Sequence, residues 1–81
     1  FFFLGELITS LDLPPDSPVV ARCGDCSRCM DSCPTGALYV PGSVDARLCI
    51  SCQTIENKGD IAPFVADRMG DRVYGCDTCQ E

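Results

Sequence analysis

The sequence predicts a small α+β domain of short helices and small β-hairpins, which needs cross-links in addition to its small apolar core. The chain has 81 residues, eight of them cysteine, and chains this short bury a smaller share of their surface than larger domains do. Proline and glycine interrupt the apolar runs, which keeps the predicted elements short. The cysteines therefore supply the cross-links that the fold needs, either as disulfides or as metal ligands.

The densest group of cysteines lies in one stretch, Cys23-Gly-Asp-Cys-Ser-Arg-Cys-Met-Asp-Ser-Cys-Pro34. Its spacing, Cys-x2-Cys-x2-Cys-x3-Cys-Pro, is the bacterial ferredoxin run, in which three close thiolates hold one [4Fe-4S] cluster and the fourth reaches a second cluster. A structural zinc site usually takes two cysteines from each of two separated knuckles. We therefore predict a bacterial-ferredoxin-like dicluster domain, with zinc binding and a disulfide scaffold as the alternatives.

The ferredoxin pattern also predicts that each cluster draws ligands from both ends of the chain. A second run begins at Cys76 and Cys79, but the sequence ends at Glu81, before the next cysteine of that run. We predict that the first cluster is held by Cys23, Cys26 and Cys29, with its fourth ligand just beyond Glu81. The second cluster is predicted to take Cys33, Cys49, Cys76 and Cys79.

One cysteine has no place in this ligand set. Cys52 lies three residues after Cys49, on the same face of a predicted helix. It is a substitute ligand, a core residue or part of the lining of a neighbouring site, and the sequence leaves these three roles open.

Composition narrows the chemistry further. The formal net charge is −6, histidine is absent and the six basic residues are scattered, so the chain has no polybasic patch for nucleic acid. Without histidine, Rieske-type ligation and nucleophile-base pairs with histidine are excluded, and we predict no catalytic residue. We expect neither a secretory leader nor a membrane span of roughly 20 apolar residues, which favours the reducing cytoplasm.

We expect residues 1–22 to be the end of a preceding domain followed by a proline-rich connector. Residues 1–8 predict a strand whose phenylalanines need cover from a sheet or another domain, with Thr9 and Ser10 as turn formers. Residues 11–18 contain three prolines, which fix φ and exclude a helix.

We expect residues 23–81 to be the iron–sulfur domain, truncated at its C-terminal end. Residues 37–40 and 43–45 predict a small hairpin around Pro41-Gly42, and residues 46–55 then show helical spacing. Asp45 is the predicted N-cap of this helix, and Gly59 is predicted in or near the left-handed position at its end. A second helix is predicted from about Pro63 to Gly70.

The order of these motifs resembles the epoxyqueuosine reductase family over essentially the whole chain. The residues that carry the resemblance are Phe3-Leu-Gly-Glu-Leu-Ile-Thr9, Leu11-Asp-Leu-Pro14, Cys33-Pro-Thr-Gly-Ala37, Asp45-Ala-Arg-x-Cys-Ile-Ser51, Thr54-Ile-Glu-x-Lys-Gly59 and Tyr74-Gly-Cys-Asp-x-Cys-Gln80. The cysteine run alone is shared by many redox proteins, whereas the stretch from Ile50 to Gly59 is far more particular.

The resemblance implies a cobalamin-dependent, iron–sulfur-dependent oxidoreductase that completes queuosine in tRNA by removing an epoxide oxygen. In this family a preceding domain binds cobalamin and carries the proton donor, and a helical-repeat domain that helps hold tRNA follows in many members. The resemblance implies the same seven cluster cysteines, but it expects an aromatic residue at the position of Cys52. The chain would then pass electrons to cobalamin, act as a monomer with an unidentified electron donor, and be inactive alone.

The resemblance also suggests that residues after the fifth cysteine approach the corrin or the tRNA. The candidates are Arg47, Ser51, Cys52, Thr54 and Lys58. Three rival functions remain at this point: a stand-alone dicluster ferredoxin, a reductive dehalogenase that also uses cobalamin and two clusters, and a zinc-binding interaction module.

Overall fold

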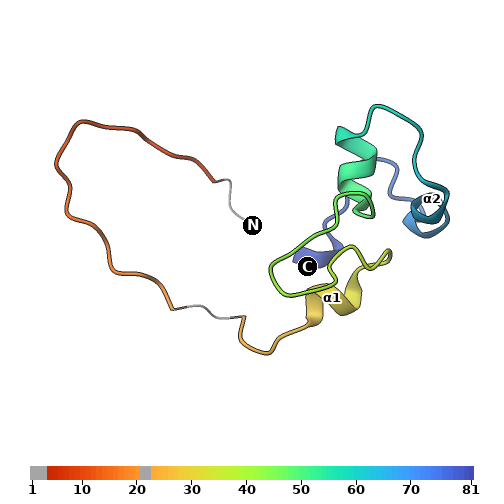
Figure 1. The fold of residues 1–81 in the computed structure, drawn as a ribbon, viewed down its shortest axis with the longest axis horizontal. Helices are drawn as coiled ribbons and strands as arrows, with labels where there is room; N and C mark the ends of the chain where they lie inside the picture. Colours follow the sequence, from red (N-terminus) through yellow and green to blue (C-terminus); the bar gives the residue numbers. More distant parts are fainter. Residues whose placement is uncertain (1–3, 21–22) are drawn as a thin grey trace.

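The computed structural model describes residues 4–20 and 23–81, which differ sharply in structure (Figure 1). Residues 4–20 are exposed and contain neither helix nor strand, and they form an open arc to one side of the other described residues, drawn in red and orange. Residues 23–81 contain four short helical elements joined by loops. They are α1 (Arg28–Ser32), the π-helix η1 (Cys52–Glu56), α2 (Pro63–Met69) and the 3-10 helix η2 (Thr78–Gln80).

The predicted N-terminal strand is absent from the part of it that the structure describes, residues 4–8. No second strand pairs with this segment, and Leu4, Leu7 and Ile8 are at least nine-tenths exposed. Phe1, Phe2 and Phe3 lie outside the described residues. The predicted turn is confirmed at Thr9, whose hydroxyl oxygen accepts a hydrogen bond from the Leu11 N–H at 3.1 Å. The connector through residues 11–18 is extended, as predicted.

The predicted hairpin is reduced to a chain reversal with one isolated antiparallel bridge, between Val40 and Ser43. The Ser43 N–H donates to the Val40 carbonyl at 3.1 Å, and the Asp45 N–H donates to the Ala37 carbonyl at 2.8 Å. A two-stranded hairpin is marginal without a third strand or a packed helix, and Val44 on this reversal is 54% exposed. The α+β prediction is therefore met in its helices, while the described residues are mostly irregular and hold no extended strand pairing.

The predicted helix after Asp45 forms later and less regularly than expected. Residues 46–48 make a turn, residues 50–51 are helical, and η1 follows with a bond from the Asn57 N–H to the Cys52 carbonyl at 3.0 Å. Asp45 caps the turn at residues 46–48, where its carboxylate accepts from the Arg47 N–H at 3.0 Å, but it is not the predicted N-cap of the helix, because Ser51 holds that position before η1. Gly59 does not take the predicted left-handed conformation. The Asn57 side chain closes this end by accepting from the Gly59 N–H at 3.0 Å.

The second predicted helix is confirmed with its bounds. Pro63 occupies the first turn of α2, where its missing N–H has no intrahelical partner to lose. The helix stops at Gly70, whose φ of 60° favours glycine. Val65 is fully buried, and the Arg68 guanidinium lies 3.8 Å from the centroid of the Phe64 ring.

Two helices were not predicted, and both carry cysteines. Cys29 lies in α1 and Cys79 lies in η2, and these two helices pack against each other. The Ser32 hydroxyl of α1 donates to the Thr78 carbonyl of η2 at 3.4 Å. Helices of five and three residues are too short to show the periodicity from which helices are predicted.

Candidate metal centre

Four cysteines from distant parts of the chain surround one cavity. Cys33 follows α1, Cys49 precedes η1, and Cys76 and Cys79 come from the C-terminal segment. The rest of the lining is formed by Pro34, Thr35, Ala37, Leu38, Val44, Ile50 and Thr78. These four cysteines are the ligands that the sequence predicts for the second cluster.

The chemistry of this cavity fits an iron–sulfur cluster. Its lining offers cysteine sulfur as the metal-binding group, without carboxylate or imidazole, and the remaining walls are largely apolar. Thiolates are the usual ligands of a [4Fe-4S] cluster, and the apolar surroundings and burial of a cluster help set its potential. Within residues 4–20 and 23–81, no three His, Cys, Asp or Glu side chains form a group suited to a single metal ion.

The thiols in this cavity influence one another electrostatically. Burial raises the pKa of Cys79, and the neighbouring Cys76, Cys33 and Cys49 raise it further, against a lowering contribution from the Cys79 backbone. The charged thiolate form of Cys79 is therefore disfavoured unless a cation compensates its charge. Iron of a cluster supplies that compensation, which couples metal binding to the folding of the segments that carry the cysteines.

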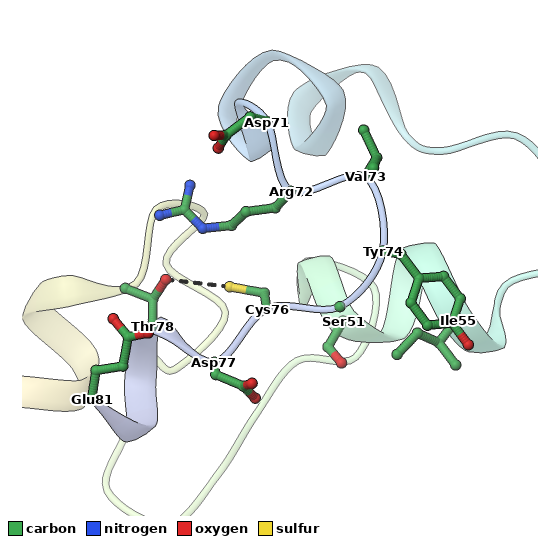
Figure 2. Close-up of a pocket in the computed structure, with 11 residues that line it drawn as sticks. Ser51, Ile55, Asp71, Arg72, Val73, Tyr74, Cys76, Asp77, Thr78 and Glu81 are labelled. Carbon is green, nitrogen blue, oxygen red and sulfur yellow. Dashed lines mark hydrogen bonds between the residues drawn. The ribbon is translucent and has the colours of Figure 1, made fainter.

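Cys33 lies in a group of hydrogen-bond donors. Burial raises the pKa of its thiol, but the Thr35 hydroxyl and the N–H groups of Thr35, Ala37 and Leu38 outweigh it, so the pKa lies below its ordinary value. The Cys33 sulfur is 3.6 Å from the Thr35 hydroxyl. The Cys76 sulfur, which also lines this cavity, is 3.4 Å from the Thr78 hydroxyl (Figure 2).

Thr54 fastens the C-terminal cysteines to the middle of the chain. Its hydroxyl donates to the Ile50 carbonyl at 2.8 Å and accepts from the Gly75 N–H at 2.9 Å. Gly75 has a φ of 78°, which lets the backbone turn directly into Cys76. Thr54 thus ties the residue before Cys76 to the helical segment that follows Cys49.

We expect Thr54→Val to destabilise the iron–sulfur region by about 1–3 kcal/mol, because it removes both bonds and leaves the Gly75 N–H without this partner. In the full-length protein we expect the second cluster to be lost faster on mild heating. The loss is measured as the decrease in visible absorbance under anaerobic conditions. Thr54→Ser retains the hydroxyl and should behave like the parent. Equal rates of cluster loss for the valine and serine variants would show that these bonds do not hold the site together.

The three cysteines predicted for the first cluster lie just before α1 and within it. Cys23, Cys26 and Cys29 are exposed, and a turn with a 2.9 Å bond from the Cys26 N–H to the Cys23 carbonyl joins the first two. Because α1 packs on η2, Cys29 lies on an element next to the segment that ends at Glu81.

The other predicted site residues do not gather around one point. Ser51 lines an open recess of about 520 Å³ together with Tyr74, Cys76 and Glu81 (Figure 2). Arg47 and Cys52 line a second, shallower recess of about 250 Å³. The Thr54 hydroxyl is engaged inside the protein, and Lys58 is exposed.

Cys52 is half-buried and is not among the residues that line the cavity of the four cysteines. It lies on the recess of Arg47, whose guanidinium pairs with Asp45 at 2.6 Å. The Arg47 guanidinium and N–H hold the pKa of the Asp45 carboxyl below its usual value. Cys52 thus lies outside the four-cysteine cavity, on a separate recess.

Comparison with protein families defines the class of this site. Residues 22–81 match the family described as "4Fe-4S double cluster binding domain". The chain belongs to this family of dicluster iron–sulfur domains.

More particular relatives are epoxyqueuosine reductases. The chain is 54% identical over 79 residues to the enzyme of Alicycliphilus denitrificans, an alignment that covers 98% of this chain and 22% of that enzyme. It is 55% identical over 80 residues to the Escherichia coli enzyme, covering 99% of this chain and 21% of the relative. The chain is therefore similar to the iron–sulfur part of these enzymes and spans about a fifth of their length.

The fold is also similar to solved structures of such enzymes. The epoxyqueuosine reductase of Bacillus subtilis gives a TM-score of 0.76 at 47% identity, covering 84% of this chain and 18% of that chain. An epoxyqueuosine reductase crystallised with an epoxyqueuosine-modified tRNA-Tyr stem loop gives a TM-score of 0.74 at 48% identity, covering 83% and 18% respectively. In the described residues no helix is both long and apolar enough to cross a membrane.

Proposed function

We propose that this chain is the electron-transfer part of a larger epoxyqueuosine reductase. In this proposal two [4Fe-4S] clusters carry electrons to a cobalamin bound mainly by a preceding domain. The overall reaction converts epoxyqueuosine to queuosine in tRNA, in the cytoplasm. The single observation that carries the proposal is the 54% identity to an epoxyqueuosine reductase over 98% of this chain.

The chain's own residues have a limited set of roles in this reaction. Cys23, Cys26 and Cys29 would hold the first cluster, and the four cysteines around the cavity would hold the second. Low-valent cobalamin supplies the reducing chemistry when it is bound, and iron–sulfur clusters reach the low potentials that its reduction requires. The protein sets the distance and the electrostatic surroundings of the redox centres.

The proposal also includes candidate residues for contact with cobalamin or tRNA. Arg47 and Cys52 lie together on one recess, and Ser51 lies on the other, so these two surfaces are the candidates for contact with the rest of the enzyme. Thr54 has a different role, because its hydroxyl binds the Gly75 N–H and so holds the neighbouring predicted cluster ligand Cys76 in place.

The test uses the full-length protein, prepared without oxygen and supplied with cobalamin and a low-potential reductant. We expect about eight iron atoms per chain, as two [4Fe-4S] clusters require, and conversion of epoxyqueuosine to queuosine in tRNA. A reductive dehalogenase would instead release halide from haloarenes, and a stand-alone carrier would contain iron but convert neither substrate. A colourless protein that binds zinc would overturn the proposal entirely.

A further inference from the structure

The same short arrangement occurs twice in the wall of the four-cysteine cavity. In Cys33-Pro-Thr35 and in Cys76-Asp-Thr78, a threonine two residues after a cysteine places its hydroxyl near the sulfur of that cysteine. The sulfur-to-oxygen distances are 3.6 Å and 3.4 Å, both within the range for hydrogen bonds to sulfur. Two of the four predicted ligands of one cluster are therefore paired with a hydroxyl.

The direction of these hydrogen bonds is fixed when metal is bound. With free thiols either atom can be the donor. A cysteine that ligates iron does so as a thiolate and has no hydrogen to give. The threonine hydroxyl must then be the donor, and its hydrogen, which carries a partial positive charge, points at the sulfur.

The surroundings make these donors effective. Thr35 is only 5% exposed and Thr78 is half-buried, and both line the cavity together with Leu38 and Ile50. In such surroundings water competes poorly for the sulfur, and a hydrogen bond to a charged group is stronger than it is in water. Hydrogen bonds to the sulfurs are among the features that set the potential of an iron–sulfur cluster.

We propose that Thr35 and Thr78 are a pair of positioning residues whose hydroxyls raise the reduction potential of the cluster held by Cys33, Cys49, Cys76 and Cys79. Reduction adds one electron to the cluster and increases the negative charge on its sulfurs. A donated hydrogen bond stabilises the more negative state more strongly, so it favours reduction. The inference rests on the proposed iron–sulfur function and concerns one cluster of the two.

The test is an anaerobic redox titration of the full-length protein, in which electron paramagnetic resonance measures the reduced fraction of each cluster. The double variant Thr35→Val, Thr78→Val keeps the branched shape of both side chains and removes both hydroxyls. We expect the equilibrium constant for reducing the second cluster to fall about tenfold, which lowers its potential by about 59 mV. The signal of that cluster is identified as the one missing from a Cys49→Ser variant.

The controls separate hydrogen bonding from a general disturbance. Thr35→Ser and Thr78→Ser retain the hydroxyls and should leave the potential near that of the parent. Thr9→Val removes a hydroxyl from the exposed connector and should shift neither cluster. Iron and sulfide are measured for every variant, so that only proteins with both clusters are compared.

An unchanged potential in the double valine variant with full iron content would overturn the inference, as would an equal shift of both clusters. If the double variant loses iron, the two single valine variants decide the matter, and each should lower the potential by a smaller amount. In one further outcome the unmutated protein binds both clusters and fails to convert epoxyqueuosine, while the double valine variant still lowers the potential. That result would overturn the proposed function and leave this inference standing.

Discussion

Replacing Cys49 by serine in the full-length protein is expected to halve its iron content, from about eight atoms per chain to about four. Cys49 lies on the cavity with Cys33, Cys76 and Cys79, so its loss removes one of the four predicted ligands of the second cluster. A cluster on an electron path cannot be bypassed, so we expect turnover of epoxyqueuosine tRNA to fall by about a hundredfold or more, as losses of essential active-site groups do. Iron and sulfide quantitation with a single-turnover assay measures both effects.

Cys52→Ser is the matched control for this experiment. The two cysteines are three residues apart in the same segment, yet Cys52 lies on the recess of Arg47 and not on the cavity. We expect this variant to keep both clusters, with about eight iron atoms per chain. Halved iron in Cys52→Ser together with full iron in Cys49→Ser would reverse the ligand assignment of these two positions.

The predictions that succeeded from sequence are those in which local chemistry decides the structure. Pro63 and Gly70 bracket α2 because one fits the first helical turn and the other tolerates a positive φ. The prediction of Asp45 as a helix N-cap is met only in part: its carboxylate accepts from the Arg47 N–H, but it caps a turn that precedes the helical segment. The four cysteines predicted for the second cluster line one cavity, while their role as cluster ligands stays a prediction.

The predictions that failed required partners that the sequence alone does not display. The apolar pattern of residues 4–8 is typical of a strand, but a strand needs a neighbour, and none pairs with these residues in the structure. Helices α1 and η2 have too few residues to show a period, and they are stabilised by packing on each other. The hydroxyls of Thr35 and Thr78 also went unrecognised as partners of cysteine, although the repeated Cys-x-Thr pattern was a signal that could have revealed them.

Removing iron is expected to unfold residues 23–81, because little else holds them together. The buried apolar side chains of the described residues are Ala37, Ile50 and Val65, and two of these are small. Burying a side chain of the size of valine or isoleucine contributes only about 1.5–3 kcal/mol, while ordering the backbone costs about 1–2 kcal/mol for each residue. Metal binding must therefore supply a large part of the folding free energy, as it does in small metal-dependent domains.

Hydrogen exchange measured by mass spectrometry on the full-length protein tests this dependence. After anaerobic chelation of iron, peptides from residues 23–81 should lose their protection, and those from α1 and η2 should lose it together, because these helices pack on each other and both carry predicted cluster ligands. Rebuilding the clusters with iron and sulfide should restore the protection. If the iron-free protein kept its protection at Ile50 and Val65, the small apolar core would be sufficient for folding, and the cysteines would serve electron transfer without serving stability.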